Sequence, residues 1–167
     1  MEIQRDMVQR GEKDSECLRR RLFNVNMRLF KDNDNYRRIV ISACDYMLKI
    51  LDYDYSNYST LKGVSGANLA IPFNIIAISK DGGNKILINP VITSMSKETV
   101  EVQSNCGSLL LKANHPVRRR KWVEVSYFDT QGQNRKEKYT LSSGGGTVQH
   151  EIEHNLGVLI TDEKGHI

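Results

Sequence analysis

The sequence predicts an α+β fold, in which antiparallel strands pack around a helix near the C-terminus and one further helix lies in the N-terminal part. Three observations predict it. One segment has apolar residues at helical spacing, two segments alternate around glycine-containing turns, and the motif His150-Glu151-Ile152-Glu153-His154 places two histidines on one helix face. With 167 residues and no repeats or linkers, the chain is expected to form a single domain over residues 1–167.

The N-terminal helix is expected from about residue 35 to residue 51. Four apolar residues recur at helical spacing and form its core face: Val40, Cys44, Met47 and Leu51. Asp34 is the expected cap of this helix. Cys44 is therefore expected to be a packing residue rather than a reactive one.

Two β-hairpins are expected after this helix. The first is built from residues 73–79 and 85–89 around the turn 81–84, and the second from residues 122–128 and 134–141 around the turn 130–133. The first turn contains Asp-Gly and Gly-Asn steps, which supply the positive φ that tight hairpins need. These strands are expected to build the antiparallel sheets.

The last helix is expected to open at Ser142 or Ser143 and to carry the histidine motif. Gly144, Gly145 and Gly146 stand in its first turns, although each glycine costs about 0.8–1 kcal/mol relative to alanine in a helix interior. Either the helix starts late or the missing side chains leave space for something else.

His150 and His154 can hold one metal ion, because residues four apart share a helix face. Glu151 follows the first histidine and would lie beside the open coordination position of the metal. A carboxylate in that place can take a proton from a water and return it later. The motif therefore indicates metal-assisted hydrolysis.

A catalytic metal site usually has three protein ligands, so a third is needed. Asp162 is possible by distance, but it follows an apolar run that should carry it away from the helix. Cys106 lies in a Gly/Asn/Ser setting after an alternating valine-rich segment, where a thiolate could point into a cleft. Cys106 is the predicted ligand, with Asp162 as the alternative. His115 and His166 lack partners at ligand spacing and are expected at the surface.

The chain resembles a peptide deformylase along nearly its whole length. Four stretches carry the resemblance: residues 3–11 (IQRDMVQRG), 87–90 (LINP), 104–108 (SNCGS) and 149–162 (QHEIEHNLGVLITD). The last is the most specific, since it is close to the family pattern QHExDHxxGxLxxD. The third resembles the family segment Glu-Gly-Cys-Leu-Ser, which supplies a metal-binding cysteine. Residues 117–132 resemble the hairpin between these two motifs.

Two departures from the family pattern bear on activity. The family's first motif reads roughly GxGxAAxQ, and residues 63–72 here read GVSGANLAIP. Leu69 or Ala70 takes the place of the glutamine, depending on the register, and neither side chain can donate a hydrogen bond to an oxyanion. Ser104 replaces the glutamate of the second motif. Loss of one oxyanion donor costs about 2.7–4 kcal/mol, so a rate lower by about 10²–10³-fold is expected.

The resemblance implies a site with assigned roles. Cys106, His150 and His154 would hold one divalent metal, with iron(II) preferred and zinc or nickel as alternatives. Glu151 would be the acid and base, and the backbone N–H of Gly107 would donate to the oxyanion.

The substrate implied by the resemblance is an N-formylmethionyl peptide or nascent chain. It would pair as an added strand with residues 63–68, which begin with Gly63, Val64, Ser65 and Gly66. Gly145 and Gly146 would widen the pocket for its first side chain. Two other classes stay open: a metallohydrolase for a different N-acyl or amide substrate, and a non-catalytic peptide-binding paralogue with a structural metal.

Composition agrees with a small cytoplasmic enzyme. The first six residues are charged rather than apolar, and no apolar run is long enough to span a bilayer. Three cysteines without a secretion signal favour reduced thiols. The net charge of +4 suits a transient ribosome contact, but residues 118–121 (RRRK) are interpreted as a solvated strand edge that deters pairing, so no specific nucleic-acid partner is expected.

Overall fold

The structure, a computed structural model, describes residues 15–57, 61–80, 83–106, 114–163 and 166–167. The helices are α1 (Ser15–Leu18), α2 (Met27–Asp32), α3 (Asp34–Asn57) and α4 (Gly145–Asn155), with short 3₁₀ turns η2 (Ala67–Leu69) and η3 (Leu141–Ser143). The strands are β1 (Gly63–Ser65), β2 (Ile75–Lys80), β3 (Gly83–Met95), β4 (Thr99–Ser104), β5 (His115–Arg120), β6 (Trp122–Phe128) and β7 (Asn134–Thr140).

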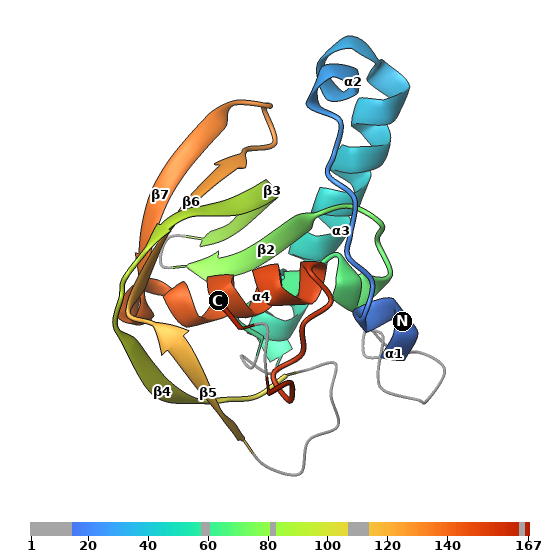
Figure 1. Cartoon of the computed structure of the whole chain (residues 1–167). Coiled ribbons are helices and arrows are strands. Elements are labelled where there is room, and N and C mark those ends of the chain that lie inside the picture. The colour runs from blue at the N-terminus through green and yellow to red at the C-terminus, as the bar shows by residue number, and fades with distance from the viewer. Residues whose placement is uncertain (1–14, 58–60, 81–82, 107–113, 164–165) are drawn as a thin grey trace.

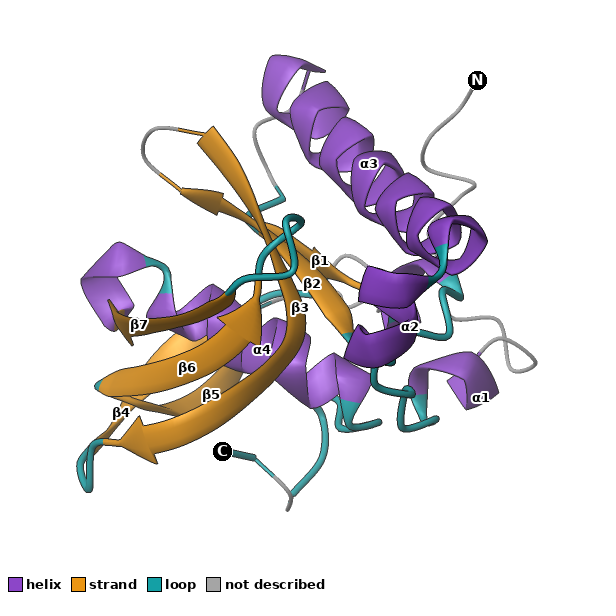
Figure 2. Cartoon of the chain, turned by 90° about the horizontal axis from the view of Figure 1, so that it is seen from above, coloured by secondary structure: helices purple, strands orange, loops and turns teal. Residues whose placement is uncertain are grey.

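The strands form two antiparallel sheets. The larger has the order β1-β2-β3-β6-β7, and the smaller pairs β4 with β5. Figure 1 shows α4 between the larger sheet and the β4–β5 pair, and Figure 2 shows α3 along the outside. The predicted α+β class, with antiparallel sheets around a C-terminal helix, is confirmed.

Strand β2 explains how the sheet can carry a helix on each face. Its sequence is apolar almost throughout, and successive side chains point to opposite faces. Ile75 and Ala77 pack in the cluster that contains the core face of α3, whereas Ile76 and Ile78 pack with Val148 and Ile152 of α4. The helix that carries the histidine motif is therefore fixed against one face of the sheet at β2, a strand that is buried on both sides.

The N-terminal helix is longer than predicted and its cap is one residue earlier. The side chain of Asn33 accepts a hydrogen bond from the backbone N–H of Tyr36 at 2.9 Å, so Asn33 rather than Asp34 caps α3. Cys44 is fully buried in the core face, as predicted. The helices α1 and α2 were not predicted, because each is too short to show a clear apolar period.

The first hairpin differs from its prediction in the length of β3, which runs on to Met95. Asn89 has a φ of 52°, and the pairing register with β6 shifts between Ile88 and Val91. The Asn89 side chain bonds the backbone N–H of Val25 at 2.7 Å and its carbonyl at 2.8 Å. This contact fixes the bulge, so the chain passes Pro90 without leaving the sheet.

The second hairpin is confirmed almost to the residue, but the start of the last helix is not. Ser143 belongs to the 3₁₀ turn η3, where it forms a capping box with Thr140, and α4 begins at Gly145. Gly144 has a φ of 86°, which suits glycine.

Residues 3–11, which carried one part of the family resemblance, lie outside the described residues. Among the described helices, none is long and apolar enough to cross a membrane.

Candidate metal centre

Three side chains converge at the C-terminal helix. Cys106 Sγ lies 3.2 Å from His154 Nε2, which lies 3.1 Å from His150 Nε2, and the three atoms are within 4.8 Å of one another. An ion with bonds of about 2.0–2.3 Å needs ligand atoms about 3.4–3.6 Å apart in tetrahedral geometry. One thiol and two imidazoles at this spacing fit a transition metal, and Cys106 rather than Asp162 completes the group.

Two elements supply the group. His150 and His154 are one turn apart on α4, with their ring centroids 4.5 Å apart in a T-shaped arrangement. Cys106 follows β4 and is buried in a cluster with Val117 of β5 and Leu159. Cys106 and His154 are enclosed, whereas His150 is partly exposed, so the group opens to solvent on the His150 side.

The surroundings favour neutral imidazoles. Burial lowers the pKa of His154 to about 4 and that of His150 well below its usual range, and the Arg119 guanidinium acts in the same direction on both. A neutral imidazole has the free nitrogen lone pair that a metal requires. Both histidines are therefore held in their metal-binding form.

Glu151 is buried beside the cluster, on the same turn of α4. Burial raises the pKa of its carboxyl to about 8, against the opposing charge of Arg119. Ser65 of β1 also acts to lower this pKa, and the buried Oε2 of Glu151 has no hydrogen-bond partner among the described residues. A buried polar atom without a partner is costly, so this oxygen fits a site whose remaining partner arrives with the metal or the substrate.

A buried ion pair behind the cluster contradicts the expectation of a solvated Arg edge. Arg119 and Glu153 are each 1% exposed, and Arg119 Nη1 lies 2.5 Å from Glu153 Oε1. Arg119 Nη2 is also 3.5 Å from His150 Nδ1. The strand β5 pairs with β4, so its residues alternate, and Arg119 points inward on the same side as Val117. The alternation along this strand was the signal in the sequence that could have predicted the inward position of Arg119.

His166 is likewise not the surface residue that was expected. Its Nδ1 lies 3.2 Å from Glu153 Oε2, and the backbone N–H of Ile167 donates to Glu153 Oε1 at 3.0 Å. Asp162, the alternative ligand, instead bonds Arg19 at 2.5 Å and accepts from the N–H of Leu159. Both residues therefore support the structure around the cluster without joining it.

Comparison with known proteins agrees with this geometry. The family model described as polypeptide deformylase matches residues 20–166. The chain belongs to the polypeptide deformylase family.

Individual relatives are similar but distant. A peptide deformylase of Wolbachia sp. subsp. Brugia malayi is 37% identical over 79 residues, 46% of this chain and 42% of that protein, so the match spans less than half the length of that relative. One from Roseiflexus sp. is 29% identical over 160 residues, 78% of this chain and 84% of that protein.

Solved deformylase structures share the fold. The class I type b peptide deformylase of Acinetobacter baumannii has a TM-score of 0.75 at 22% identity, covering 93% of this chain and 95% of that one. The Synechococcus elongatus deformylase, solved with actinonin, has a TM-score of 0.73 at 25% identity, covering 96% and 79%.

The segment that departs from the deformylase first motif packs directly on α4. A Cβ on Gly63 would lie 2.5 Å from Thr147 Cγ2 and 2.9 Å from Glu151 Cγ, so glycine permits this close approach. The side chain of Val64 is part of the core under α3. The N–H of Gly66 donates to the Ile75 carbonyl of β2, and its carbonyl accepts from the N–H groups of Leu69 and Ile71.

The two candidates for the glutamine position differ in their surroundings. Leu69 packs in the α3 core, whereas Ala70 is exposed and has a φ of 54°. The buried amide of this segment is Asn68, which sequence reasoning missed because it stands where the family pattern has a small apolar residue. Its Oδ1 accepts hydrogen bonds from the backbone N–H and from the hydroxyl of Ser65.

The glycines before the histidine motif have separate roles. A Cβ on Gly145 would lie 2.7 Å from the carbonyl oxygen of Thr140, so this glycine is required by packing, whereas one on Gly146 would meet nothing closer than 3.8 Å. Their predicted contact with a substrate side chain remains a prediction. Gly107, the predicted backbone donor, lies outside the described residues.

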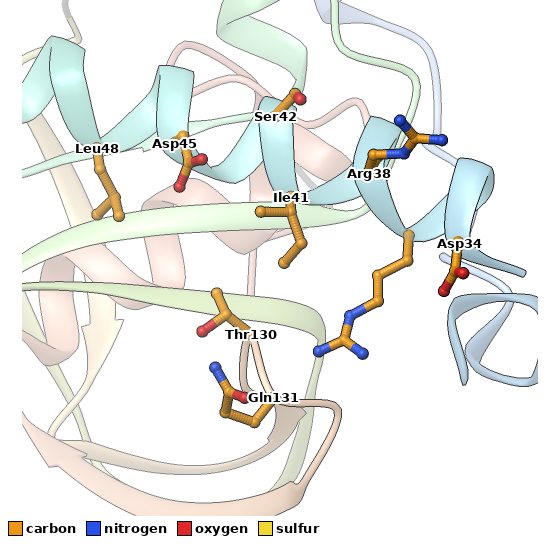
Figure 3. A pocket seen from close by; sticks show the side chains of 9 residues that line it. Asp34, Arg38, Ile41, Ser42, Asp45, Leu48, Thr130 and Gln131 are labelled. Atoms are coloured by element: carbon orange, nitrogen blue, oxygen red, sulfur yellow. The ribbon is translucent and has the colours of Figure 1, made fainter. Parts of the chain in front are cut away.

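A broad groove lies elsewhere on the molecule, and its lining residues differ in type from the Cys and His residues of the metal centre. It has a volume of about 790 Å³ and lies between α3 and the turn that joins β6 and β7, with Arg38, Ile41 and Gln131 among its lining residues (Figure 3). Among the described residues that line it, none is a Cys or a His. The metal centre is thus formed by side chains packed between layers, not by this groove.

Proposed function

We propose that this protein is a metal-dependent peptide deformylase, which hydrolyses the N-formyl group of N-formylmethionyl peptides. The observation that carries the proposal is the Cys106, His150 and His154 group with the buried Glu151 beside it, within a deformylase fold. A formylated nascent chain is the proposed substrate, which places the reaction in the cytoplasm and near the ribosome.

Each residue has one task in this reaction. Cys106, His150 and His154 would hold the metal, with iron(II) as the first choice and zinc or nickel as alternatives. When bound, the metal supplies Lewis acidity, which lowers the pKa of water and polarises the formyl carbonyl. Glu151 takes a proton from the attacking water and delivers it to the departing amine. The backbone N–H of Gly107 is proposed to donate to the oxyanion.

The substrate would add to the free edge of β1. In the described part of the chain β1 pairs only with β2, and hydrogen bonds from Ser79 to the Lys62 carbonyl and from Gly66 to the Ile75 carbonyl identify the groups that face β2. Because backbone groups alternate along a strand, those of Gly63 and Ser65 face away from β2. An extended peptide is proposed to pair there, with Gly146 beside its first side chain.

A reduced rate is part of the proposal. Neither Leu69 nor Ala70 offers a side-chain donor, and such donors are worth about 10²–10³-fold in rate. Because Leu69 is in the core, Ala70→Gln is the variant that tests this point. We expect it to raise kcat on formyl-Met peptides by about 10–10³-fold while KM moves less. An unchanged kcat in a folded, metal-loaded variant would refute the simple loss of a donor.

The proposed function is tested by formate release. Protein purified anaerobically and loaded with iron(II) should release formate from formyl-Met-Ala-Ser and lose this activity on chelation. Cys106→Ser should lose most of the metal, whereas Glu151→Gln should keep the metal and lose turnover, because an amide cannot carry the proton. A panel of other N-acyl peptides is the control. Faster turnover of another acyl group would make that group, rather than formyl, the assigned substrate. Full turnover in Glu151→Gln would rule out Glu151 as the acid and base.

A further inference from the structure

The free edge of β1 is partly occupied by a side chain of the segment that follows it. Gly63 and Ser65 direct their backbone groups away from β2, towards the edge at which the proposed peptide would pair. One of these groups, the N–H of Ser65, donates to Oδ1 of Asn68 at 2.7 Å. A backbone N–H has a single hydrogen, so a bond this short occupies it.

The Asn68 amide is held in this place by a second bond to the same residue. Its Oδ1 also accepts the hydroxyl hydrogen of Ser65 at 2.7 Å, and Ser65 Oγ accepts the backbone N–H of Asn68 at 3.4 Å. Both residues are buried, Ser65 at 0% exposed and Asn68 at 3%. Turning the amide away would leave a buried N–H and a buried hydroxyl without an acceptor, which is costly, so the contact is expected to persist.

This contact comes from a residue that the deformylase pattern does not have. Aligning Gly63 with the first glycine of GxGxAAxQ places Asn68 on the second alanine. An alanine side chain has no polar atom and could not bind the Ser65 N–H. The occupied edge is therefore a feature of this chain and not of the family pattern.

We propose that Asn68 is a specificity-determining residue, which closes the Ser65 N–H to peptide substrates. In an antiparallel pair with β1, the residue opposite Ser65 would donate its N–H to the Ser65 carbonyl and accept the Ser65 N–H with its own carbonyl. The Asn68 oxygen takes the place of that peptide carbonyl. The edge therefore recognises the N–H of a ligand at this position rather than its carbonyl. This inference rests on the proposed function, since it concerns how the proposed substrate pairs with β1.

The affinity of the zinc-loaded protein for the product peptide Met-Ala-Ser tests the role without turnover. Isothermal titration gives Kd for the wild type and for each folded variant. Asn68→Ala frees the Ser65 N–H for the peptide, so Kd should fall by about 2–10-fold, the value of one hydrogen bond. Asn74→Ala is the matched control, because it removes an asparagine amide whose side-chain bonds run to Asn24 and Asn155. Its Kd should equal that of the wild type.

A second measurement needs only the wild-type protein. In NMR spectra of isotope-labelled, zinc-loaded protein, the Gly63 amide should shift on addition of Met-Ala-Ser, whereas the Ser65 amide should not, because its acceptor stays the same. Equal shifts of both amides, an unchanged or higher Kd in Asn68→Ala, or no binding by either protein would overturn the inference. If Asn68→Ala binds more tightly but the wild type releases no formate, the proposed hydrolysis fails and this inference stands.

Discussion

At the scale of single residues, Glu153 differs from its neighbours in the histidine motif. It lies between the two histidines in sequence, yet its carboxylate bonds Arg119, His166 and the N–H of Ile167. Burying two charges costs several kcal/mol per ion, which their attraction recovers only when both are present. The ion pair is therefore weak evidence that the two charges stabilise the fold. It is strong evidence that removal of one partner alone destabilises the fold.

Arg119→Met should destabilise the fold by about 3–5 kcal/mol, because it leaves the Glu153 carboxylate buried without its main partner. The double variant Arg119→Met/Glu153→Leu should be more stable than Arg119→Met alone, since no isolated charge remains. Urea unfolding of the wild type and of the variants measures this. Exposed Arg118→Met is the control on the same strand. A double variant less stable than the Arg119 single variant would contradict the account.

Sequence reasoning at this scale found the residues whose types are distinctive. His150, His154 and Cys106 could be chosen because few residues bind metals at such spacing, and the structure brings them together. Asn68 and the burial of Arg119 were missed, and Ser65 was expected only as a backbone partner of the substrate. A serine, an asparagine and a buried arginine have no distinctive spacing, and their roles depend on which strand packs against α4.

At the scale of elements, Glu137 connects its own strand with three other strands of the large sheet. It lies on β7 and forms ion pairs with Lys80 of β2 and Lys85 of β3, and it accepts hydrogen bonds from Tyr127 of β6 at 3.2 Å and from Tyr139 at 2.9 Å. Partial burial alone would raise its pKa, but the hydrogen bonds from the two lysines lower the pKa of Glu137 to about 2.

Acid unfolding should report this carboxylate. A folded pKa of about 2 against an ordinary value of 4.5 corresponds to at most about 3 kcal/mol of stability. Because the folded pKa is depressed, this stability is present above about pH 4.5 and is lost as the pH falls towards 2. The difference in unfolding free energy between the wild type and Glu137→Gln should therefore shrink over that range. A difference that stays constant from pH 6 to pH 3 would exclude the assignment.

The first turn of α4 offers a matched pair of glycines. Gly145→Ala should destabilise the protein, since its Cβ would meet the backbone of Thr140 and Tyr139, which cannot move without disturbing β7. Gly146→Ala should instead stabilise it by about 0.5–1 kcal/mol, because alanine is the better helix former and the space is open. Thermal unfolding separates the two. The KM of Gly146→Ala additionally tests its proposed contact with the substrate: a rise supports the contact.

Elements could be predicted where local pattern decides them. Strands β6 and β7 were found nearly to the residue, because alternation and a short polar turn determine a hairpin. The length of β3 and the start of α4 were not. The first depends on a side chain, Asn89, that bonds a distant segment, and the second on a capping box that keeps Ser143 outside the helix.

At the scale of the whole molecule, the metal group connects separate layers. Cys106 follows β4 of the small sheet, and the two histidines belong to α4, which packs on the large sheet. An ion bound by all three would cross-link these parts. Since binding requires the folded arrangement, its free energy adds to the free energy of folding.

Metal should therefore raise the thermal stability of the protein. At a free metal concentration of 100 times Kd the expected gain is about 2.7 kcal/mol, visible as a higher Tm in zinc-loaded than in chelated protein. Cys106→Ser should reduce this gain, whereas Cys44→Ser, a change in the other cysteine whose burial the structure describes, should lower both Tm values and leave the gain intact. Equal metal-dependent gains in wild type and Cys106→Ser would remove Cys106 from the ligand set.

The shortness of β1 limits how firmly any peptide can be held. Of the backbone groups of Gly63 and Ser65, which face away from β2, the Ser65 N–H is already bound by Asn68. With respect to the described residues, the N–H of Gly63 and the carbonyls of Gly63 and Ser65 are left for the proposed peptide, each worth about 0.5–1.5 kcal/mol. Residues further along a peptide gain nothing from this edge. A tripeptide and a long nascent chain should therefore dissociate at similar, fast rates. The product should leave quickly, and the affinity should not depend on the length of the chain.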